Sequence, residues 1–327
     1  MAARAGVSKS VVSRVLRQDA SVSAARREAV MAAVEALGYR PNAVARSLVQ
    51  RRTFNVGVVV SDLHNLFFAE ILDGIGAAAS HAGYNVLITS GRLLPAHQER
   101  ALETLLQLRT DGIILAGSQL SAAAVRAASR SVPVALVTSG LRAPRVDTVA
   151  TDDVKGAGLA VEHLVGLGHC RIAMVDGGDG PGSAERRAGY RAAMQRFGLA
   201  ACARVAAGDY TEDGGWRGTR CLLRQDPRPT AICAANDLAA IGALNAIAEA
   251  GLEVPADVSV VGYDNTALAA LRHVALTTVH QPRFQIGEMA MTAVLGRLGS
   301  PTARARRVLL EPRLVVRQTT ARPPVEF

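Results

Sequence analysis

Polar side chains recur in this sequence at the ends of short apolar runs, where they could bind a small polar molecule. Asp62 and Asn65 follow the apolar run Asn55–Ser61, and Asp264 follows Ser259–Tyr263. If these runs are parallel strands, their carboxyl ends meet at the edge where open α/β sheets bind ligands. Further residues follow predicted strands in the same way: Phe67, Phe68, Ser90, Gly117, Ser118, Asp176, Gly177, Gly178, Asn236, Asp237 and Asn265. Hydrogen-bonding groups mixed with aromatic faces are typical of a site for a polar small molecule.

Catalytic chemistry finds less support in the sequence. The glycine-rich segment GGDGPG at Gly177–Gly182 invites comparison with a phosphate-binding loop, but Ser183 stands where G-x-G-x-x-G requires its last glycine. The sequence also contains no G-x-x-x-x-G-K-[ST], no G-x-S-x-G before a helix and no H-E-x-x-H. These absences favour a binding protein over an enzyme, and no cofactor is expected.

The cysteines and the apolar runs indicate a cytoplasmic protein. The cysteines show no C-x-x-C or His-paired spacing, so we expect reduced thiols and no metal site; they are Cys170, Cys202, Cys221 and Cys233. No apolar run approaches the roughly 18 residues that a membrane helix needs, and the polar, basic N-terminus is not a secretory leader.

Alternating strands and helices after Thr53 predict two lobes, each with a parallel sheet. The expected strands are Asn55–Ser61, Asn85–Thr89, Gly112–Ala116 and Val134–Val137 in the first lobe, and Arg171–Val175, Arg204–Ala207, Ala231–Ala234 and Ser259–Tyr263 in the second. The expected helices are Phe68–Ala82, Gln98–Leu108, Ala122–Ser129, Gly156–Leu167, Ala184–Gly198, Gly214–Arg224 and Leu238–Ala250. Two such runs give two Rossmann-like lobes with a cleft between them.

Positive charge is concentrated at the start of the chain. Residues 1–52 contain ten Lys and Arg against three Asp and Glu, which accounts for +7 of the total formal charge of +9. A basic segment joined to a nearly neutral body is the electrostatic pattern of a protein that meets a polyanion with one end. A solvated basic surface or a general preference for Arg would give the same count, so charge alone leaves these interpretations open.

The basic segment also carries the signals of a helix-turn-helix. Gly6 marks a tight turn, and Ser8 is a favoured N-cap for the helix that follows. The apolar side of that helix is formed by Val11, Val12, Val15 and Leu16, which leaves outside Lys9, Ser10, Ser13, Arg14 and Arg17. Another helix is expected from a Ser23 cap to a stop at Gly38. A short helix with Ser, Lys and Arg near its start can enter the major groove and reach bases and phosphates.

The segment Tyr39–Leu48, YRPNAVARSL, predicts a helix of about two turns that starts near Pro41. Such a helix is marginal alone in water because helix nucleation is costly. Two interpretations stay open: an ordinary linker, or a hinge that becomes ordered when it lies on DNA.

The motif GVSKSVVSRVL, followed by VSAARREAVMAAVEALGYRPNAVARSL, resembles the lactose-repressor (LacI/GalR) family of bacterial transcription regulators, and the resemblance covers almost the whole chain. It implies an α/β fold: a periplasmic-binding-protein-like body of two Rossmann-like lobes, preceded by a small all-α helix-turn-helix head and a hinge helix. The expected boundaries are 1–40 for the head, 41–53 for the hinge helix and linker, and 54–327 for the body. Within the body we expect 54–151 and 282–300 in the first lobe, and 152–281 and 301–327 in the second.

The resemblance also implies which residues contact DNA. In the family, the helix matching Ser8–Leu16 reads the major groove. The hinge leucine matching Leu48 wedges into the central minor-groove step of a palindromic operator and bends it. The implied DNA contacts are Ser8, Lys9, Ser10, Ser13, Arg14, Asn42, Ala45 and Leu48.

A second set of residues is implied to bind the effector. Arg186 in ERRAGY matches an arginine that commonly binds effector hydroxyls or carboxylates, and Asp264 in VVGYDN matches an acid that often takes hydroxyl groups. Asn236 in AANDLAAIGAL belongs to a ligand-contacting pair with Asp237, although a helix N-cap is the alternative. Trp216 falls on an aromatic position that often stacks on the effector; a core residue is the alternative. The expected effector site is Asp62, Phe67, Phe68, Ser118, Arg186, Trp216, Asn236 and Asp264.

The expected function is a sequence-specific DNA-binding regulator, a repressor by default, that acts as a homodimer on palindromic operator DNA. A small polar effector, a sugar or derivative, would control its operator affinity. The alternative is a solute or sugar sensor whose head no longer binds DNA. Family members begin with several further residues, so the first helix of the head is expected to be incomplete here. Either the start is mis-assigned at Met1 or the head is truncated.

Overall fold

The computed structural model describes residues 1–16, 19, 21–38, 52–91, 94–138, 140, 141 and 143–324. Contacts within the chain divide it into two compact units, Met1–Thr53 and Phe54–Phe327. The first unit is the basic segment, and the second contains the alternating strands and helices.

The first unit, the head, contains the helices α1 (Lys9–Leu16) and α2 (Ala24–Ala36). α1 follows a left-handed turn at Gly6, where φ is +63°, and the hydroxyl of Ser8 accepts a hydrogen bond from the Val11 N–H at 3.4 Å. The core of the head consists of Val12, Val15, Val22 and Val30, against which Met1, Ala2, Ala5, Val7, Val11, Leu16 and Val34 pack. The apolar side of α1 is therefore the one that the sequence predicts.

The start of α2 differs from the expectation in one respect. Ser23 occupies the N-cap position, but its side chain makes no capping hydrogen bond. The loop before it is instead closed by Asp19, whose carboxylate accepts from the N–H and the hydroxyl of Ser21 and whose carbonyl oxygen accepts from Arg27. Gly38, with φ of +56°, follows the end of the helix.

The first lobe of the body contains a six-stranded sheet in the order β11-β5-β4-β3-β1-β2, and every neighbouring pair is parallel. Its strands are β1 (Asn55–Val60), β2 (Asn85–Ser90), β3 (Gly112–Ala116), β4 (Val134–Val137), β5 (Val146–Thr151) and β11 (Arg307–Leu310). Its helices are α4 (Phe67–His81), α5 (Pro95–Gln107), α6 (Ala122–Ser131) and α11 (Arg283–Gly299).

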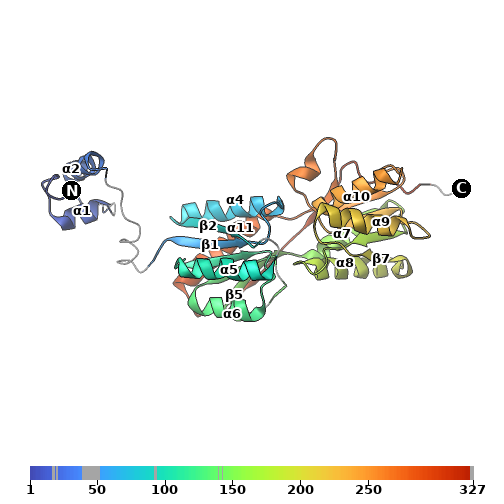
Figure 1. The fold of residues 1–327 in the computed structure, drawn as a ribbon, viewed down its shortest axis with the longest axis horizontal. Coiled ribbons are helices and arrows are strands. Elements are labelled where there is room, and N and C mark those ends of the chain that lie inside the picture. Colours follow the sequence, from blue (N-terminus) through green and yellow to red (C-terminus); the bar gives the residue numbers. More distant parts are fainter. Residues whose placement is uncertain are drawn as a thin grey trace. The chain divides into compact units, whose positions relative to one another are not determined.

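Helices cover both faces of this sheet, which explains why its central strands are apolar throughout. Val56 and Val58 of β1 belong to the core formed with α4 and α11, whereas Val59 belongs to the core formed with α5 and α6. Figure 1 shows the layers of this lobe. α4 and α11 approach backbone to backbone: a Cβ on Gly74 would lie 2.0 Å from the carbonyl oxygen of Phe284. Glycine is therefore required at this contact.

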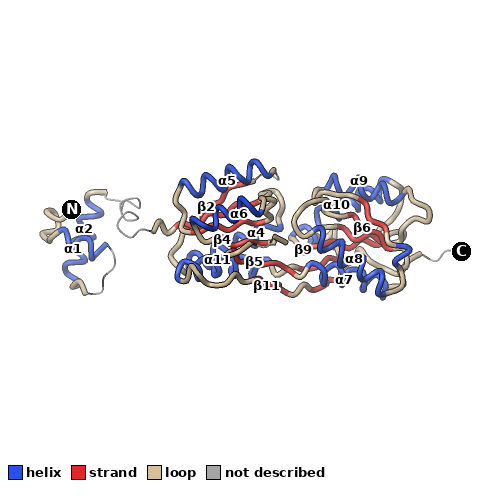
Figure 2. Tube along the Cα trace, turned by 90° about the horizontal axis from the view of Figure 1, so that it is seen from below, coloured by secondary structure: helices blue, strands red, loops and turns tan. Residues whose placement is uncertain are grey.

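The second lobe contains another six-stranded sheet, ordered β12-β10-β9-β8-β6-β7, in which only β12 is antiparallel to its neighbour. Its strands are β6 (Ile172–Val175), β7 (Arg204–Ala206), β8 (Ala231–Ala234), β9 (Ser259–Asp264), β10 (Thr277–His280) and β12 (Arg313–Val315). Its helices are α7 (Asp153–Gly166), α8 (Ser183–Arg196), α9 (Glu212–Leu223) and α10 (Asp237–Glu249). The core on one face involves α9 and α10, and the core on the other involves α7 and α8. Figure 2 shows helices around the strands of each lobe.

The chain passes between the two sheets three times, after β5, after β10 and after β11. One expected boundary is therefore wrong. Residues 301–327 were assigned to the second lobe, but β11 pairs with β5 in the first sheet, with Val308 opposite Val149. Only β12, after this strand, joins the second sheet.

Four strands were not predicted: β5, β10, β11 and β12. β5 reads VDTVAT, in which the charged Asp147 interrupts the apolar run that a buried strand usually shows. The buried carboxylate of Asp147 is paired, because Arg297 of α11 donates two hydrogen bonds of 2.8 Å to it. β11 and β12 are short strands at sheet edges, which give little apolar signal.

Candidate functional site

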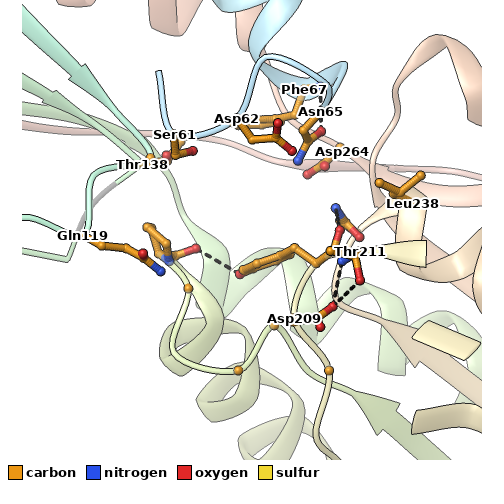
Figure 3. Close-up of a pocket in the computed structure, with 18 of the residues that line it drawn as sticks. Ser61, Asp62, Asn65, Phe67, Gln119, Thr138, Asp209, Thr211, Leu238 and Asp264 are labelled. Atoms are coloured by element: carbon orange, nitrogen blue, oxygen red, sulfur yellow. Dashed lines mark hydrogen bonds between the residues drawn. The ribbon is translucent and has the colours of Figure 1, made fainter. Parts of the chain in front are cut away.

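A cavity of about 470 Å³ lies between the two lobes of the body. Its lining comes from segments that follow the carboxyl ends of strands, the position at which open α/β sheets bind ligands. Ser61 and Asp62 follow β1, Thr138 follows β4, and Asp264 ends β9. Figure 3 shows Asp62, Asn65 and Phe67 on the first-lobe side, Thr211 and Leu238 on the other, and Asp264 between them. A cleft of this size, with aromatic and polar groups, suits a small polar ligand.

Most of the residues predicted for the effector site line this cavity. They are Asp62, Phe67, Phe68, Arg186, Asn236 and Asp264. Ser118 does not; its hydroxyl lies 3.4 Å from Gln98 Oε1 and accepts from the Leu120 N–H at 3.2 Å. The neighbouring Gln119 lines the cavity in its place.

Trp216 also lies away from the cavity, which contradicts its predicted stacking role. Its Nε1–H donates to Glu249 at the end of α10 at 3.0 Å, and the guanidinium of Arg220 lies 4.4 Å from the centre of its ring. Gly215 of α9 lies against the backbone of Ala239 in α10, and the indole of Trp216 lies toward the protein surface. The aromatic residue that lines the cavity on this lobe is Tyr210. Tyr210 follows β7, so the strand-end rule, applied to that strand too, would have found it.

Arg186 is the centre of a buried network on the second-lobe wall. Its Nε–H donates to Asp153 at 2.9 Å, and Nη1 donates to the carbonyl oxygen of Ala235 and lies 3.8 Å from the Asp264 carboxylate. The guanidinium also lies 3.8 Å from the centre of the Tyr263 ring, a cation–π distance. Burial alone would lower the pKa of Arg186, but the nearby carboxylates raise it well above its usual value. This side chain is therefore fixed and charged.

Asp264 lies at the end of β9 with 3% of its surface exposed. Its carboxylate accepts a hydrogen bond from Gln281 Nε2 at 2.7 Å. Burial raises the pKa of Asp264 to about 7, although Arg186 acts in the opposite direction. Asp264 therefore titrates close to neutral pH. It accepts hydrogen bonds when ionised and can also donate one when protonated.

Asn236 caps α10 and also lines the cavity. Its Oδ1 accepts from the Ala239 N–H at 2.8 Å, and its Nδ2 donates to the carbonyl oxygen of Tyr210 at 3.0 Å. Asp237, implied as its ligand-contacting partner, is instead enclosed: it accepts from Thr266 N at 2.6 Å and from the Thr278 hydroxyl at 2.6 Å. The capping interpretation of Asn236 is therefore confirmed, and Asp237 stabilises the loop after β9.

Several cavity residues adopt a backbone conformation that is rare outside glycine. The φ angles are +52° at Thr138, +65° at Tyr210 and +108° at Asp264. For a β-branched residue such as Thr138 this is a genuine outlier. Strain of this kind persists where the surrounding structure enforces it, and it clusters at functional sites.

The first-lobe wall has fewer internal contacts. The rings of Phe67 and Phe68 meet edge to face with their centres 5.1 Å apart, and both side chains are buried. Asn65 Oδ1 accepts from the Phe67 N–H at 3.0 Å at the start of α4. Among the described residues, the partners of Asp62 are the backbone and ring of His64, two residues along the chain. This wall combines aromatic surface with a locally held carboxylate.

In the head, α1 presents its polar side to solvent. The predicted DNA-contacting residues Ser8, Lys9, Ser10, Ser13 and Arg14 are all exposed. The predicted hinge contacts Asn42, Ala45 and Leu48 lie outside the described residues. Helix-turn-helix proteins bind the major groove of DNA with a helix of this kind, polar and basic on its exposed face and packed on a small apolar core.

Two other kinds of site were sought in the described part of the chain. No helix there is both long and apolar enough to cross a bilayer, and no group of three or more His, Cys, Asp or Glu is placed to hold a metal ion. Cys233 is buried, which raises the pKa of its thiol to about 12, while Cys170, Cys202 and Cys221 are exposed.

Comparison with known proteins gives matches in both units. Residues 1–42 match the family described as bacterial regulatory proteins, lacI family, and residues 161–320 match a periplasmic binding protein-like domain. The chain is 34% identical over 317 residues to the ribose operon repressor of Escherichia coli (strain K12), covering 96% of each protein.

Solved structures of lacI-family proteins are also similar to this chain. The lac repressor dimer bound to operator and the anti-inducer ONPF is 32% identical, with a TM-score of 0.86 over 98% of this chain and 97% of that chain. A LacI family transcriptional regulator from Enterococcus faecium with bound ribose is 28% identical, with a TM-score of 0.74 over 82% of this chain and 99% of that chain.

Proposed function

Because the chain belongs to the lacI family of bacterial regulatory proteins, we propose that it is a sequence-specific transcriptional repressor controlled by a small polar effector. It acts in the cytoplasm, where its operator DNA is, and binds a palindromic operator as a homodimer, one head on each half-site. The effector, a sugar or a close derivative, binds in the cavity between the lobes. The ribose operon repressor and the lac repressor are named as repressors, and no catalytic step is proposed.

The observation that carries this proposal is the joint match of head and body. The relationship to the ribose operon repressor spans 96% of both chains, so the head and the two-lobed body occur together in each. A related regulator has been solved with ribose bound. The cavity, lined by both polar and apolar groups, and the exposed polar side of α1 are compatible with effector binding by the body and DNA binding by the head.

Control of DNA binding requires the two ends of the protein to be coupled. A ligand shifts an equilibrium only through its different affinity for the two conformations. The cavity is formed by both lobes, so a ligand that contacts both favours one lobe arrangement over another. The change in lobe arrangement alters the spacing of the two heads in the dimer, and with it the operator affinity.

The test is operator binding by the full-length protein, measured by fluorescence anisotropy on palindromes near its own gene and on scrambled duplexes, over a range of salt concentrations. We expect specific binding, and we expect Arg14→Ala to weaken it and reduce the log–log salt slope by about 0.9, the value for one phosphate contact. Arg126→Ala, which removes an exposed charge from α6 of the body, is the control and should change neither the affinity nor the salt slope.

Equal affinity for palindromic and scrambled DNA would overturn the repressor function. The proposed control by an effector is tested by adding sugars, ribose first, to the protein–operator complex. Asp264→Ala should remove the response to a sugar that shifts operator binding and leave operator affinity without sugar unchanged. If Asp264→Ala responds like the parent protein, the cavity is not the control site.

A further inference from the structure

The ionisable side chains that line the cavity are predominantly acidic. Asp62, Asp179, Asp209 and Asp264 face it, of which Asp209 is paired with Arg217 and Asp264 lies beside Arg186, the one basic residue in the described lining. Ionised carboxylates only accept hydrogen bonds, so a ligand held by them must bring donors. From this imbalance we propose that the effector is an uncharged or amine-bearing polyhydroxyl compound, and that the cavity rejects its phosphorylated or carboxylated counterparts. The inference rests on the proposed function in taking this cavity as the effector site.

Arg186 is not available as a receptor for an anion. Asp153 accepts from its Nε–H at 2.9 Å, and the Asp264 carboxylate lies 3.8 Å from Nη1. Its side chain is only 6% exposed. With Asp153 hydrogen-bonded to it and Asp264 beside it, the Arg186 guanidinium is paired within the protein and is not directed at a ligand.

The basic side chains behind the lining are also paired. Arg187 pairs with Asp176, and Arg217 pairs with Asp209 at 2.9 Å and also with Asp213. Arg283 pairs with Glu70 at 2.7 Å, and its remaining donors go to the carbonyl oxygens of Asp264 and Asn265. His64 beside Asp62 points into solvent, with its side chain 99% exposed. None of these cations is directed at the cavity without a partner.

The glycine-rich loop that resembles a phosphate loop supplies independent support. The N–H groups of Gly178 and Gly208 both donate to the carboxylate of Asp176, at 3.0 and 3.1 Å, and the Gly177 N–H donates to Ser183 at 3.1 Å. Backbone N–H groups of such a loop are what would bind a phosphate. Here the Gly178 N–H is taken by the chain's own buried Asp176 carboxylate and the Gly177 N–H by the Ser183 hydroxyl, so these two donors are not available to an anion.

The loop continues with more negative charge. Asp179 at its tip is exposed and lines the cavity, and Glu185 lies in the first turn of α8. A phosphate approaching the start of α8 would therefore meet two carboxylates. A hydroxyl or ammonium group would instead find acceptors there, and Phe67 and Phe68 on the opposite wall provide apolar surface for a sugar ring.

The experiment measures binding to the full-length protein without DNA, by isothermal titration calorimetry. The probes are matched sets on one scaffold: ribose with ribose 5-phosphate, and glucose with glucosamine, gluconate and glucose 6-phosphate, together with inorganic phosphate alone. We expect a neutral or amine member to bind and its phosphorylated or carboxylated counterpart to bind at least about tenfold more weakly, because like charges repel in a partly buried site. Inorganic phosphate should not bind.

Two variants test which carboxylates cause the weaker binding of the anionic probes. Asp62→Asn and Asp179→Asn each remove one negative charge from the lining and should narrow the ratio between neutral and phosphorylated probes. Asp73→Asn, on the exposed side of α4 and away from the cavity, is the matched control and should leave the ratio unchanged.

The proposal is overturned if an anionic probe binds more tightly than its neutral parent, or if no neutral or amine probe binds. These results are separable from failure of the proposed function. A neutral sugar that binds without altering operator affinity would contradict the proposed function and leave this inference standing. An anionic compound that binds more tightly than its neutral parent and shifts operator affinity would overturn this inference and leave the proposed function standing.

Discussion

Compared with the first-lobe wall of the cavity, the second-lobe wall holds its polar side chains with many more partners. Arg186, Asn236 and Asp264 are 5%, 1% and 3% exposed, and each is bonded to groups of the same lobe. On the first-lobe wall, the bonds that Asp62 makes to described residues stay within its own loop, and Phe67 contributes apolar surface. If the cavity is the effector site, as proposed, the second lobe supplies its more strongly held polar wall and the first lobe a more loosely held one. Preorganised groups lower the cost of binding, so most of the effector affinity should depend on the second lobe.

The largest effect is expected from Arg186→Ala, which removes the centre of the second-lobe network. Asp153 and Asp264 would remain buried without their cation, and breaking a buried pair costs about 3–5 kcal/mol of stability. Urea unfolding monitors the loss. Arg191→Ala, an exposed arginine on the same helix, should stay within about 0.5 kcal/mol of the parent protein. Similar losses for the two variants would contradict the idea of a preformed network.

The next effect is a dependence of stability on pH that originates in the same wall. The pKa of Asp264 rises from an ordinary 3.8 to about 7 in the folded protein because the group is buried. The folded state therefore keeps a proton that the unfolded chain loses, and this contribution to stability is present below about pH 4. It is lost as the pH rises through about 7, with a slope of at most about 1.4 kcal/mol per pH unit.

Asp264→Asn removes this titration and should flatten the fall in unfolding free energy between about pH 4 and 7. A smaller fall should remain, because burial also raises the pKa of Asp237, to about 6. Urea denaturation series at several pH values compare the two proteins. If the unfolding free energy of the two proteins depends on pH in the same way, Asp264 does not titrate in this range in the folded state.

A smaller change is expected from Asn236→Ala, with Ser121→Ala as its counterpart in the first lobe. Both side chains cap a helix, accepting from Ala239 and Ala124 respectively, so each loss should cost about 1 kcal/mol of stability. Only Asn236 lines the cavity. Calorimetry with a bound sugar should therefore show weaker binding for Asn236→Ala alone, and equal binding by both variants would remove Asn236 from the site.

The smallest effect on stability is expected from Asp62→Asn on the first-lobe wall. Its Oδ1 accepts from the His64 N–H, and an amide oxygen can accept the same bond. The unfolding free energy should change by less than about 0.5 kcal/mol. A loss comparable to that of Arg186→Ala would show that the first-lobe wall is as strongly organised as the second and would end the contrast between them.

The sequence predicts the fold better than it predicts the site, for physical reasons. Strands such as β3 and β4 are buried on both faces, so their apolar runs could be recognised directly. β5 and β11 could not, because their place in the sheet depends on partners distant in the chain, such as Arg297 for Asp147. Local patterns carry no information about such partners.

Within the site, strand ends predicted the positions of Asp62 and Asp264 because the topology forces those positions to one edge. The prediction that Trp216 lies in the cavity was wrong because this residue lies within a helix, where the direction of a side chain depends on how the helix packs. Gly242 of α10 lies so close to α9 that a Cβ on it would be 1.9 Å from the Glu212 carbonyl oxygen. That contact sets the rotation of α9 and turns Trp216 outward, and no pattern local to Trp216 reveals it.

The three passages of the chain between the lobes also bear on how the protein is made. The first sheet is complete only when β11 pairs with β5, and α11 must arrive before α4 is covered. The second lobe up to β10 is an insertion between these parts. On the ribosome, the first lobe would therefore wait with an unpaired edge and an uncovered helix while the second lobe emerges. Its completion depends on residues synthesised after the second lobe up to β10, so the nascent first lobe exposes apolar surface and an unpaired strand edge during that interval.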